Sequence, residues 1–335
     1  MIDFKELIFN VSPKKLKAFF YHRYLIELSN KNYNGSKADL KIKDINFSLF
    51  LKDQKSYLTY SKFFDEGVVY EETLVFSLTK ILEKFKEPSF LDVGSYLGYY
   101  SIYPAKLFGT NINIFAFESN KESSSLISKS LELNNIKNVT IFNNVLSNKS
   151  EEIITYDTLC LTKNKINSIL KSTMDKHEKY ILEQMLDKGF KTKSCSLDEI
   201  CEKNKIIPDV IKIDVHGSEG QVLLGSKNFV LKKAKYIFLE LHPDSLLEKN
   251  SDGIMSKDIF NLFYDSGFKT YMISPFRYTN RDPDFIRFKK NQKLKYLEIT
   301  SNNISNTLFD RREDCLILAI HKNFSIEDLA FFEQN

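Results

Sequence analysis

The stretch FLDVGSYLGYYS, residues 90–101, decides how the rest of the sequence is interpreted. A short apolar run reaches Asp92 and is followed by Gly94 and Gly98 in a D-x-G-x-x-x-G pattern. Glycines at a strand-to-helix turn permit positive φ angles and a close approach of the backbone to a ligand. The pattern lacks the middle glycine of the dinucleotide fingerprint, and Asp92 would repel a pyrophosphate. The turn therefore suits a ligand with an ammonium or sulfonium group, which points to S-adenosylmethionine.

Short apolar strands alternate with helices outward from this turn. Such alternation predicts a mostly parallel sheet with helices on both faces. Ligands of these sheets lie beyond the carboxyl ends of the strands. The predicted strands span residues 89–94, 112–118, 138–147, 209–215, 236–242, 268–274 and 314–321. The predicted helices span residues 71–85, 99–109, 121–135, 196–204, 218–234 and 257–267.

A polar residue follows the apolar run of each of the first five strands. Because the carboxyl ends of parallel strands share one edge, we expect these residues to border a single site. They are Asp92, Glu118, Asn143, Asp214 and Glu240. Glu118 stands where a carboxylate can accept hydrogen bonds from both ribose hydroxyls, although an acid near a helix start is the alternative. Asn143 and Asn144 could border an adenine ring, or serve only as turn residues.

The segment KIDVHGSEG, residues 212–220, carries candidate catalytic groups. In a strand, Lys212, Asp214 and His216 would share one face. Asp214 could bind the ammonium of the cofactor or position an acceptor, and pairing with Lys212 is the alternative. Histidine is the residue type suited to accept a proton near neutral pH, so His216 is a candidate base, or else a histidine bonded to the backbone. Glu219 lies in the first turn of the next helix, where support of the helix dipole is the favoured role.

Glu240 and His242 close the fifth strand in the segment ELHP. Pro243 holds His242 in an extended conformation, and we predict His242 as the general base, slightly ahead of His216. A divalent cation could also find ligands among Asp214, His216, Glu240 and His242. The ligand spacing is not distinctive, and we expect no metal.

The composition excludes several other classes of protein. A net charge of +4 over 335 residues is slight and argues against nucleic-acid binding. The four cysteines lack C-x-x-C pairing, which indicates reduced thiols. Neither a signal peptide nor a membrane span is recognisable. We therefore expect a cytoplasmic protein, and the sequence carries no sign of its oligomeric state.

Taken in order along the chain, these motifs resemble the FkbM family of S-adenosylmethionine-dependent methyltransferases. They are PSFLDVGSYLGYYS, FAFESNKE, VTIFNNVLSN, SLDEIC, PDVIKIDVHGSEGQVLLG and YIFLELHP. The resemblance implies the class I methyltransferase fold, an α/β Rossmann-like, mostly parallel seven-stranded sheet with an antiparallel last strand. His216 stands where the family usually has Glu. The resemblance implies that Asp92, Gly94, Gly98 and Glu118 bind S-adenosylmethionine and that Asp214, Gly217 and Glu219 form the fourth-strand motif. We predict Ser95, Ser119, Asn144 and Asp214 as further cofactor-binding residues.

The family resemblance implies methylation of a hydroxyl on a sugar, a glycan or glycolipid, or a similar small molecule. The predicted catalytic residues are His242, His216 and Asp214. Two alternatives remain open at this stage. One is an NAD-dependent oxidoreductase with a similar sheet. The other is a non-catalytic S-adenosylmethionine-binding module of a glycan-assembly complex, in which His216 would mark lost activity.

Two regions fall outside the resemblance. We expect residues 1–62 to form an N-terminal helical extension and residues 63–335 to form the methyltransferase domain. A charged helical insertion is expected at about residues 156–190 within that domain. The Lys- and Arg-rich face of the extension could touch acidic lipid, although a solvated helix face is favoured.

Overall fold

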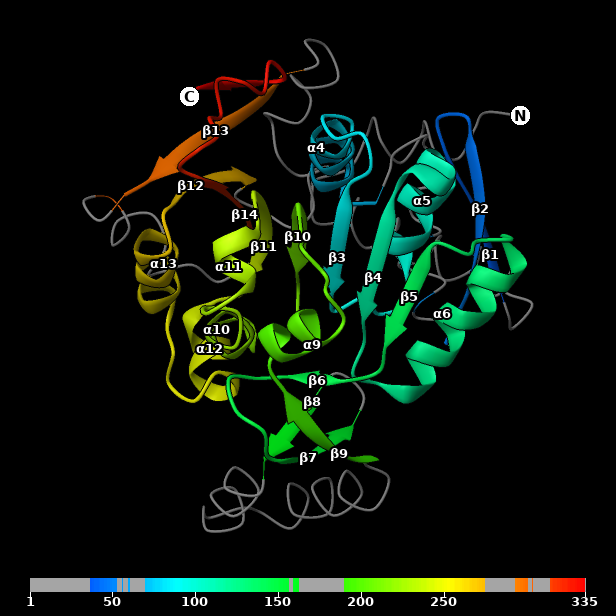
Figure 1. Cartoon of the computed structure of the whole chain (residues 1–335), viewed down its shortest axis with the longest axis horizontal. Coiled ribbons are helices and arrows are strands. Elements are labelled where there is room, and N and C mark those ends of the chain that lie inside the picture. The colour runs from blue at the N-terminus through cyan, green and yellow to red at the C-terminus, as the bar shows by residue number, and fades with distance from the viewer. Residues whose placement is uncertain are drawn as a thin grey trace, which may run out of the picture.

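The computed structural model describes residues 37–52, 56, 60, 70–156, 159–162, 190–274, 293–300, 303 and 314–334 (Figure 1). A large central sheet with helices on both sides makes up most of this part of the chain (Figure 1). None of the helices in these ranges is both long enough and apolar enough to cross a bilayer.

Within the described residues the central sheet has nine strands. Their spatial order is β15 (Phe332–Gln334), β13 (Leu294–Ile299), β12 (Phe268–Ser274), β14 (Cys315–His321), β11 (Tyr236–Leu241), β10 (Val210–Ile213), β3 (Ser89–Val93), β4 (Asn113–Phe117) and β5 (Val139–Phe142). Strands β5, β4, β3, β10 and β11 are parallel, and β14 runs antiparallel to β11 and β12. Counted along the chain, the strands from β5 to β12 lie in the order 3-2-1-4-5-7-6. The predicted Rossmann-like sheet with an antiparallel last strand is confirmed, with two strands more than the seven predicted because β13 and β15 extend it at one edge.

Two apolar layers hold the helices against the sheet. Neighbouring residues of one strand contribute to different layers, as Phe238 and Leu239 of β11 do, because side chains alternate across a sheet. The first layer lies under α4 (Glu72–Leu82), α5 (Tyr99–Phe108) with the short 3-10 turn η1 (Gly109–Asn111), and α6 (Lys121–Leu133). The second lies under α9 (Leu197–Lys203), α10 (Glu219–Leu224), α11 (Val230–Lys233), α12 (Asp244–Asn250) and α13 (Ser256–Asp265).

The helix predicted over residues 218–234 is divided into α10 and α11. The break follows Gly225, where a Cβ atom would lie 2.4 Å from the carbonyl oxygen of Ser147. Gly225 is the C-terminal cap of α10, and its close approach to Ser147 requires a residue without a Cβ atom.

The prediction of helices up to residue 62 is wrong for residues 37–50, which form an antiparallel hairpin of β1 (Lys37–Ile42) and β2 (Ile45–Phe50). Residues 1–36 lie outside the described part of the chain. Apolar residues recur at every second position of the hairpin, which is the period of a half-buried strand. Ala38, Ile42, Phe47 and Leu49 are buried as a result. The lysines between these apolar residues give the segment the composition of a solvated helix.

A second, smaller sheet corrects part of the predicted helical insertion. Its strands, in spatial order, are β6 (Val145–Leu146), β9 (Phe190–Cys195), β7 (Glu152–Tyr156) and β8 (Leu159–Thr162). Both ends of the segment predicted as helical are therefore strands, while residues 163–189 lie outside the described ranges. In Figure 1 the small sheet lies beyond the arrowheads of β3, β4 and β5, at the edge where ligands of such sheets bind.

Candidate active site

The glycine turn, residues 94–98, connects β3 to α5 and packs directly on the end of β10. Gly94 has φ +78°, and a Cβ atom there would lie only 1.7 Å from the backbone oxygen of Asp214. Gly98 precedes the first residue of α5 with φ +82°. Both positions require conformations that side chains disfavour, and the first also requires the absence of a side chain.

Glu118 holds the glycine turn from the end of β4. Its carboxylate accepts hydrogen bonds from the backbone N–H groups of Tyr96 and Asn120, each at 2.7 Å. The side-chain amide of Asn143 donates to the carbonyl oxygen of Glu118 at 2.7 Å, which ties in the end of β5. Burial raises the pKa of Glu118 to about 7, although the two backbone hydrogen bonds and the charge of Lys212 oppose this rise.

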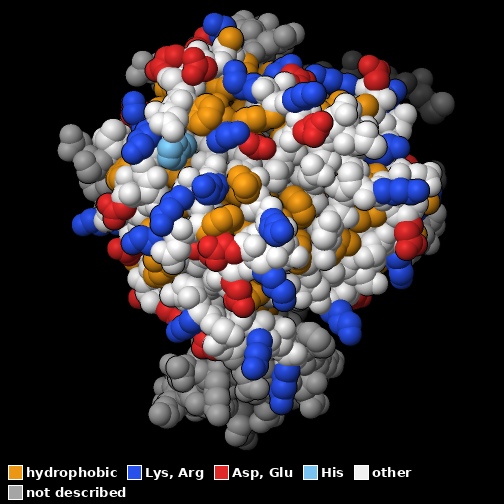
Figure 2. All heavy atoms as spheres, viewed as in Figure 1, with side chains coloured by type: hydrophobic (Ala, Val, Ile, Leu, Met, Phe, Trp, Pro, Cys, Tyr) orange, Lys and Arg blue, Asp and Glu red, His pale blue; other side chains and the backbone are white. Residues whose placement is uncertain are grey.

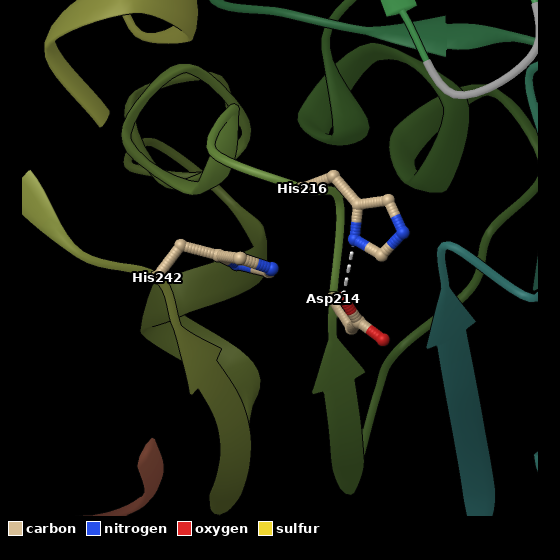
Figure 3. A group of neighbouring side chains, drawn as sticks. All are labelled: Asp214, His216 and His242. Atoms are coloured by element: carbon tan, nitrogen blue, oxygen red, sulfur yellow. Dashed lines mark ion pairs between the residues drawn. The ribbon is translucent and has the colours of Figure 1, made fainter. Parts of the chain in front are cut away.

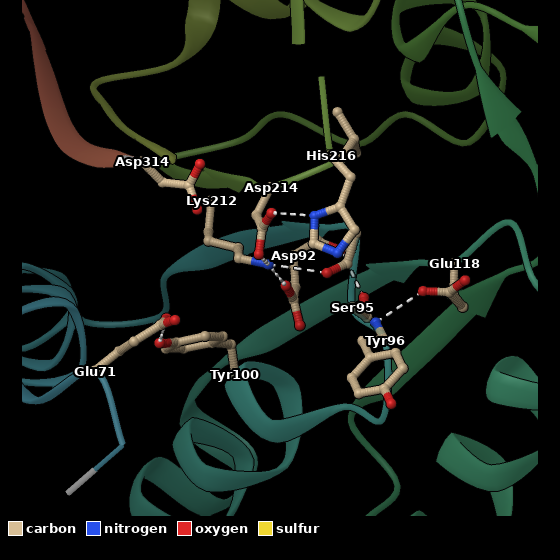
Figure 4. A network of polar contacts seen from close by, with 12 residues as sticks. Glu71, Asp92, Ser95, Tyr96, Tyr100, Glu118, Lys212, Asp214, His216 and Asp314 are labelled. Atoms are coloured by element: carbon tan, nitrogen blue, oxygen red, sulfur yellow. Dashed lines mark hydrogen bonds and ion pairs between the residues drawn. The ribbon is translucent and has the colours of Figure 1, made fainter. Parts of the chain in front are cut away.

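A buried ion network lies beneath the turn (Figure 4). Asp92 is completely buried and accepts a hydrogen bond from Ser101 Oγ at 2.7 Å. Lys212 Nζ lies 3.5 Å from Asp92 Oδ1 and 3.7 Å from Asp214 Oδ2, and it donates to the carbonyl oxygen of Gly94 at 2.9 Å. Burial lowers the pKa of Lys212, but the surrounding carboxylates outweigh it and hold this pKa above its ordinary value. Lys212 therefore remains a cation.

His216 follows β10 in an unusual backbone conformation. Its φ of +52° is uncommon for a residue with a side chain, and such strain is often found at functional sites. Asn250 Nδ2 donates to the carbonyl oxygen of His216 at 2.8 Å and holds this turn. The imidazole Nδ1 lies 3.3 Å from Asp214 Oδ1, and 39% of the side chain is exposed (Figure 3). Asp214 thus orients a histidine that solvent can reach.

His242 is buried and held by Glu219. Nδ1 of His242 lies 2.8 Å from Glu219 Oε1, with side chains 4% and 0% exposed. The same oxygen accepts from the backbone N–H groups of Val215 and Gly217, at 3.3 and 3.1 Å. Burial opposes protonation of His242, but the hydrogen bond and the nearby carboxylates raise its pKa above the ordinary value. Glu219 therefore lies in the first turn of α10, as predicted, and in addition contacts His242, a predicted catalytic residue.

Asp314 was missed by the sequence analysis. Its Oδ1 lies 3.8 Å from Nε2 of His242. Because β14 is antiparallel to β11, Cys315 at its start pairs with Leu241 at the end of β11. A polar residue just before an antiparallel strand therefore reaches the same edge as polar residues just after parallel strands. The position of Asp314 directly before the last strand is the sequence feature that indicates its place in the site.

Five side chains meet at this edge, and we call them the strand-end cluster. They are Asp214, His216, Glu240, His242 and Asp314. The ring centroids of His216 and His242 are 5.3 Å apart. The structure thus brings together the predicted catalytic residues and adds Asp314.

The other predicted cofactor residues lie nearby on the adjoining strand ends. Ser95 Oγ donates to the carbonyl oxygen of Asp92 at 2.7 Å, so it stabilises the glycine turn. Ser119 and Asn144 are half-buried after β4 and β5. It is Asn143, rather than Asn144, whose side chain donates to the carbonyl oxygen of Ser119, at 3.1 Å.

The strand order, the glycine turn and the carboxylate after β4 together define the class I methyltransferase type of α/β protein. The family model described as "Methyltransferase FkbM domain" matches residues 92–270, which is more than half of the chain, and the chain belongs to this family. S-adenosylmethionine is accordingly its cofactor. The site fits this group, because Gly94 and Gly98 hold the turn after β3 in positive-φ conformations and Glu118 is a buried carboxylate that holds this turn from the end of β4.

Solved structures with a similar arrangement are also methyltransferases by their titles. A precorrin-6y C5,15-methyltransferase from Geobacter metallireducens GS-15 is 12% identical, with 75% of this chain and 88% of that chain covered and a TM-score of 0.35. A putative O-methyltransferase from Klebsiella pneumoniae is 10% identical, with 76% and 81% covered and a TM-score of 0.37. Similarity at this level says nothing about the acceptor. No curated protein matches the sequence.

Proposed function

We propose that the protein is an S-adenosylmethionine-dependent O-methyltransferase acting on a hydroxyl of a sugar, a glycolipid or a similar small molecule. The observation that carries this proposal is the double role of Asp214. Its backbone oxygen touches the glycine turn at Gly94, and its side chain meets the imidazole of His216. The proposed cofactor-binding turn and the candidate proton acceptor, His216, therefore both contact Asp214.

The cofactor would be held by the carboxyl ends of β3, β4 and β10. When bound, S-adenosylmethionine supplies an electrophilic methyl group on a sulfonium centre. Glu118 would accept hydrogen bonds from the ribose hydroxyls, and the glycine turn would approach the rest of the molecule through its backbone. The carboxylate of Asp214, whose backbone contacts the glycine turn, would provide the negative potential that a cationic group requires.

Deprotonation of the acceptor hydroxyl is the role proposed for a histidine, because an alcohol is a poor nucleophile while protonated. His242 was favoured from sequence, but its Nδ1 is bonded to Glu219, its Nε2 faces Asp314, and only 4% of its side chain is exposed. His216 is oriented through Nδ1 by Asp214 and is far more exposed. The geometry therefore supports His216 as the base. The hydroxyl proton would pass to His216 Nε2 while the acceptor oxygen bonds the methyl group.

The surface charge supports a small acceptor more than a nucleic acid. On the face seen in Figure 2, Lys and Arg side chains are interspersed with acidic and apolar ones and do not form a continuous basic tract. Proteins that bind nucleic acids through their backbone gather basic residues on one face.

Calorimetric titration of the full chain with S-adenosylmethionine and with NAD is the first test. We expect binding of S-adenosylmethionine and none of NAD, and the reverse result would contradict the proposed function. The second test incubates the protein with isotopically labelled S-adenosylmethionine and with glycan and lipid extracts, followed by mass spectrometry. A labelled methyl group on a hydroxyl supports the proposal, whereas cofactor binding without any product would favour the non-catalytic module.

The affinity for S-adenosylmethionine should depend on pH through Glu118. In the free protein its pKa is about 7, and ribose hydroxyls that donate to the carboxylate would lower this pKa on binding. Binding would then release a proton. As the pH rises toward 7, the dissociation constant should therefore fall by up to about tenfold per pH unit, and above pH 7 it should become constant. Calorimetry between about pH 5.5 and 8.5 measures this dependence.

Glu118→Gln is the matched variant for this experiment. Gln cannot ionise, so the contribution of residue 118 to the pH dependence should vanish and the affinity at high pH should fall. Glu132→Gln, which changes an exposed carboxylate on α6, should behave like the original protein. An unchanged pH profile in Glu118→Gln would remove Glu118 from ribose binding.

A further inference from the structure

We propose that Glu240, His242 and Asp314 form a binding site for a divalent transition-metal cation. Glu240 and His242 lie at the carboxyl end of β11, and Asp314 directly precedes β14, next to the His216–Asp214 pair. The site is separate from the glycine turn and from the proposed proton acceptor.

The spacing of the three ligand groups fits one cation. One ligand atom from each of the three lies within 4.8 Å of the others. Nε2 of His242 and Oδ1 of Asp314 are 3.8 Å apart. Bonds of about 2.1 Å to one ion place neighbouring ligand atoms about 3.0–3.5 Å apart. The His242–Asp314 pair therefore needs a contraction of less than about 1 Å, and the other pairs one of at most about 1.8 Å. All three groups are at least half-buried, which limits competition from water.

The hydrogen bond on the far side of His242 is an independent sign of a metal ligand. Metal-binding histidines almost always donate their other ring N–H to a carboxylate or carbonyl group, which fixes the tautomer. Here Glu219, completely buried and anchored by two backbone N–H groups, lies 2.8 Å from Nδ1 of His242. With the proton on Nδ1, the lone pair of Nε2 is directed toward Glu240 and Asp314.

The charge balance of this region also favours a cation. Four carboxylates, those of Asp214, Glu219, Glu240 and Asp314, surround His242. The ammonium of Lys212 lies 3.7 Å from Asp214 and also interacts with Glu240. Buried carboxylates are costly unless opposite charges balance them. A divalent cation at Glu240, His242 and Asp314 would provide this balance.

The donor set suggests which cations would bind. Carboxylate oxygens suit Mn²⁺ and Mg²⁺, while an imidazole nitrogen favours Mn²⁺, Fe²⁺ or Zn²⁺ over Mg²⁺. If the proposed function is correct, an open coordination position would hold the acceptor hydroxyl and lower its pKa. The imidazole of His216, whose ring centroid is 5.3 Å from that of His242, is then near the bound oxygen. This last step rests on the proposed function, but binding of the cation does not.

Mn²⁺ titration of the full chain, stripped beforehand with a chelator, tests the site. Calorimetry and electron paramagnetic resonance should show one Mn²⁺ per chain. Asp314→Asn and Glu240→Gln should each weaken binding at least about tenfold, and Glu219→Gln about 10- to 100-fold through His242. Asp265→Asn, an exposed carboxylate at the end of α13, should bind Mn²⁺ as the original chain does.

S-adenosylmethionine affinity, measured on the same preparations, separates this inference from the proposed function. It should stay within about threefold in the Asp314 and Glu240 variants, which also shows that they are folded. Absence of stoichiometric binding of Mn²⁺ and Zn²⁺ to the stripped chain, or equal Mn²⁺ binding by the cluster variants, would overturn the metal site. Methyl transfer that persists in the stripped protein would then leave the proposed function intact.

Discussion

Gly94→Ala should abolish detectable binding of S-adenosylmethionine and lower the free energy of unfolding by about 3 kcal/mol or more. The added Cβ atom would lie 1.7 Å from the backbone oxygen of Asp214, and a backbone atom cannot rotate away. Either the glycine turn or the end of β10 must move. Both carry groups of the candidate site, so a displacement of about 1 Å is enough to disrupt it.

Gly253→Ala is the matched control for this substitution. Gly253 has φ +83°, close to the +78° of Gly94, but nothing lies within 4 Å of a Cβ atom there. It should therefore cost only the strain of a positive φ, about 1 kcal/mol. Denaturant unfolding of the two variants isolates the effect of the close approach to Asp214. Equal free energies of unfolding would show that the turn and β10 are not packed in this way.

His216→Ala should lower kcat by about 10²- to 10⁴-fold, the usual contribution of a positioned base. The affinity for S-adenosylmethionine should change less than about threefold, because His216 Nε2 is assigned to the acceptor. Steady-state kinetics on the methylated acceptor, together with calorimetry, measure the two effects separately. Equal losses of turnover and cofactor affinity would indicate a role in binding the cofactor.

Two further variants separate loss of the imidazole from a change in the backbone of the turn. His216 has φ +52°, so alanine could alter the turn as well as remove the imidazole. Asn tolerates this backbone conformation better than most residues, and His216→Asn should lose turnover to a similar extent. His321→Ala, at the opposite end of β14 from Asp314, should retain turnover. Normal turnover in His216→Asn would rule out His216 as the base.

The central sheet was predictable because its strands are buried on both faces. Near-continuous apolar runs such as YIFLEL over residues 236–241 have few alternative interpretations when polar residues and helices bound them. The β1–β2 hairpin was missed for the opposite reason. One face of each strand carries Lys, Asp or Asn, and at a composition level such a segment resembles a solvated helix. Only the recurrence of apolar residues at every second position distinguishes these strands from such a helix.

The site was predictable where its residues directly follow a parallel strand, as Asp214 and His216 follow β10 and His242 follows β11. Asp214, His216 and His242 are found by this rule, and the structure brings them together. Asp314 precedes the last strand, which the family resemblance already implies to be antiparallel, but the strand-end rule covers only residues that follow parallel strands. The contact between Glu219 and His242 joins two turns from different strands, so position on a helix gave no sign of it.

Lys212 has a consequence for how the chain assembles. It is the register partner of Asp92 across strands β10 and β3, and both side chains are almost entirely buried. A slip of one residue would direct the lysine to the opposite face and leave Asp92 without its cation. The remaining residues of β10, Val210, Ile211 and Ile213, are similar apolar side chains that distinguish poorly between alignments. The buried ammonium of Lys212 therefore favours the native alignment of β10 with β3 over an alignment shifted by one residue.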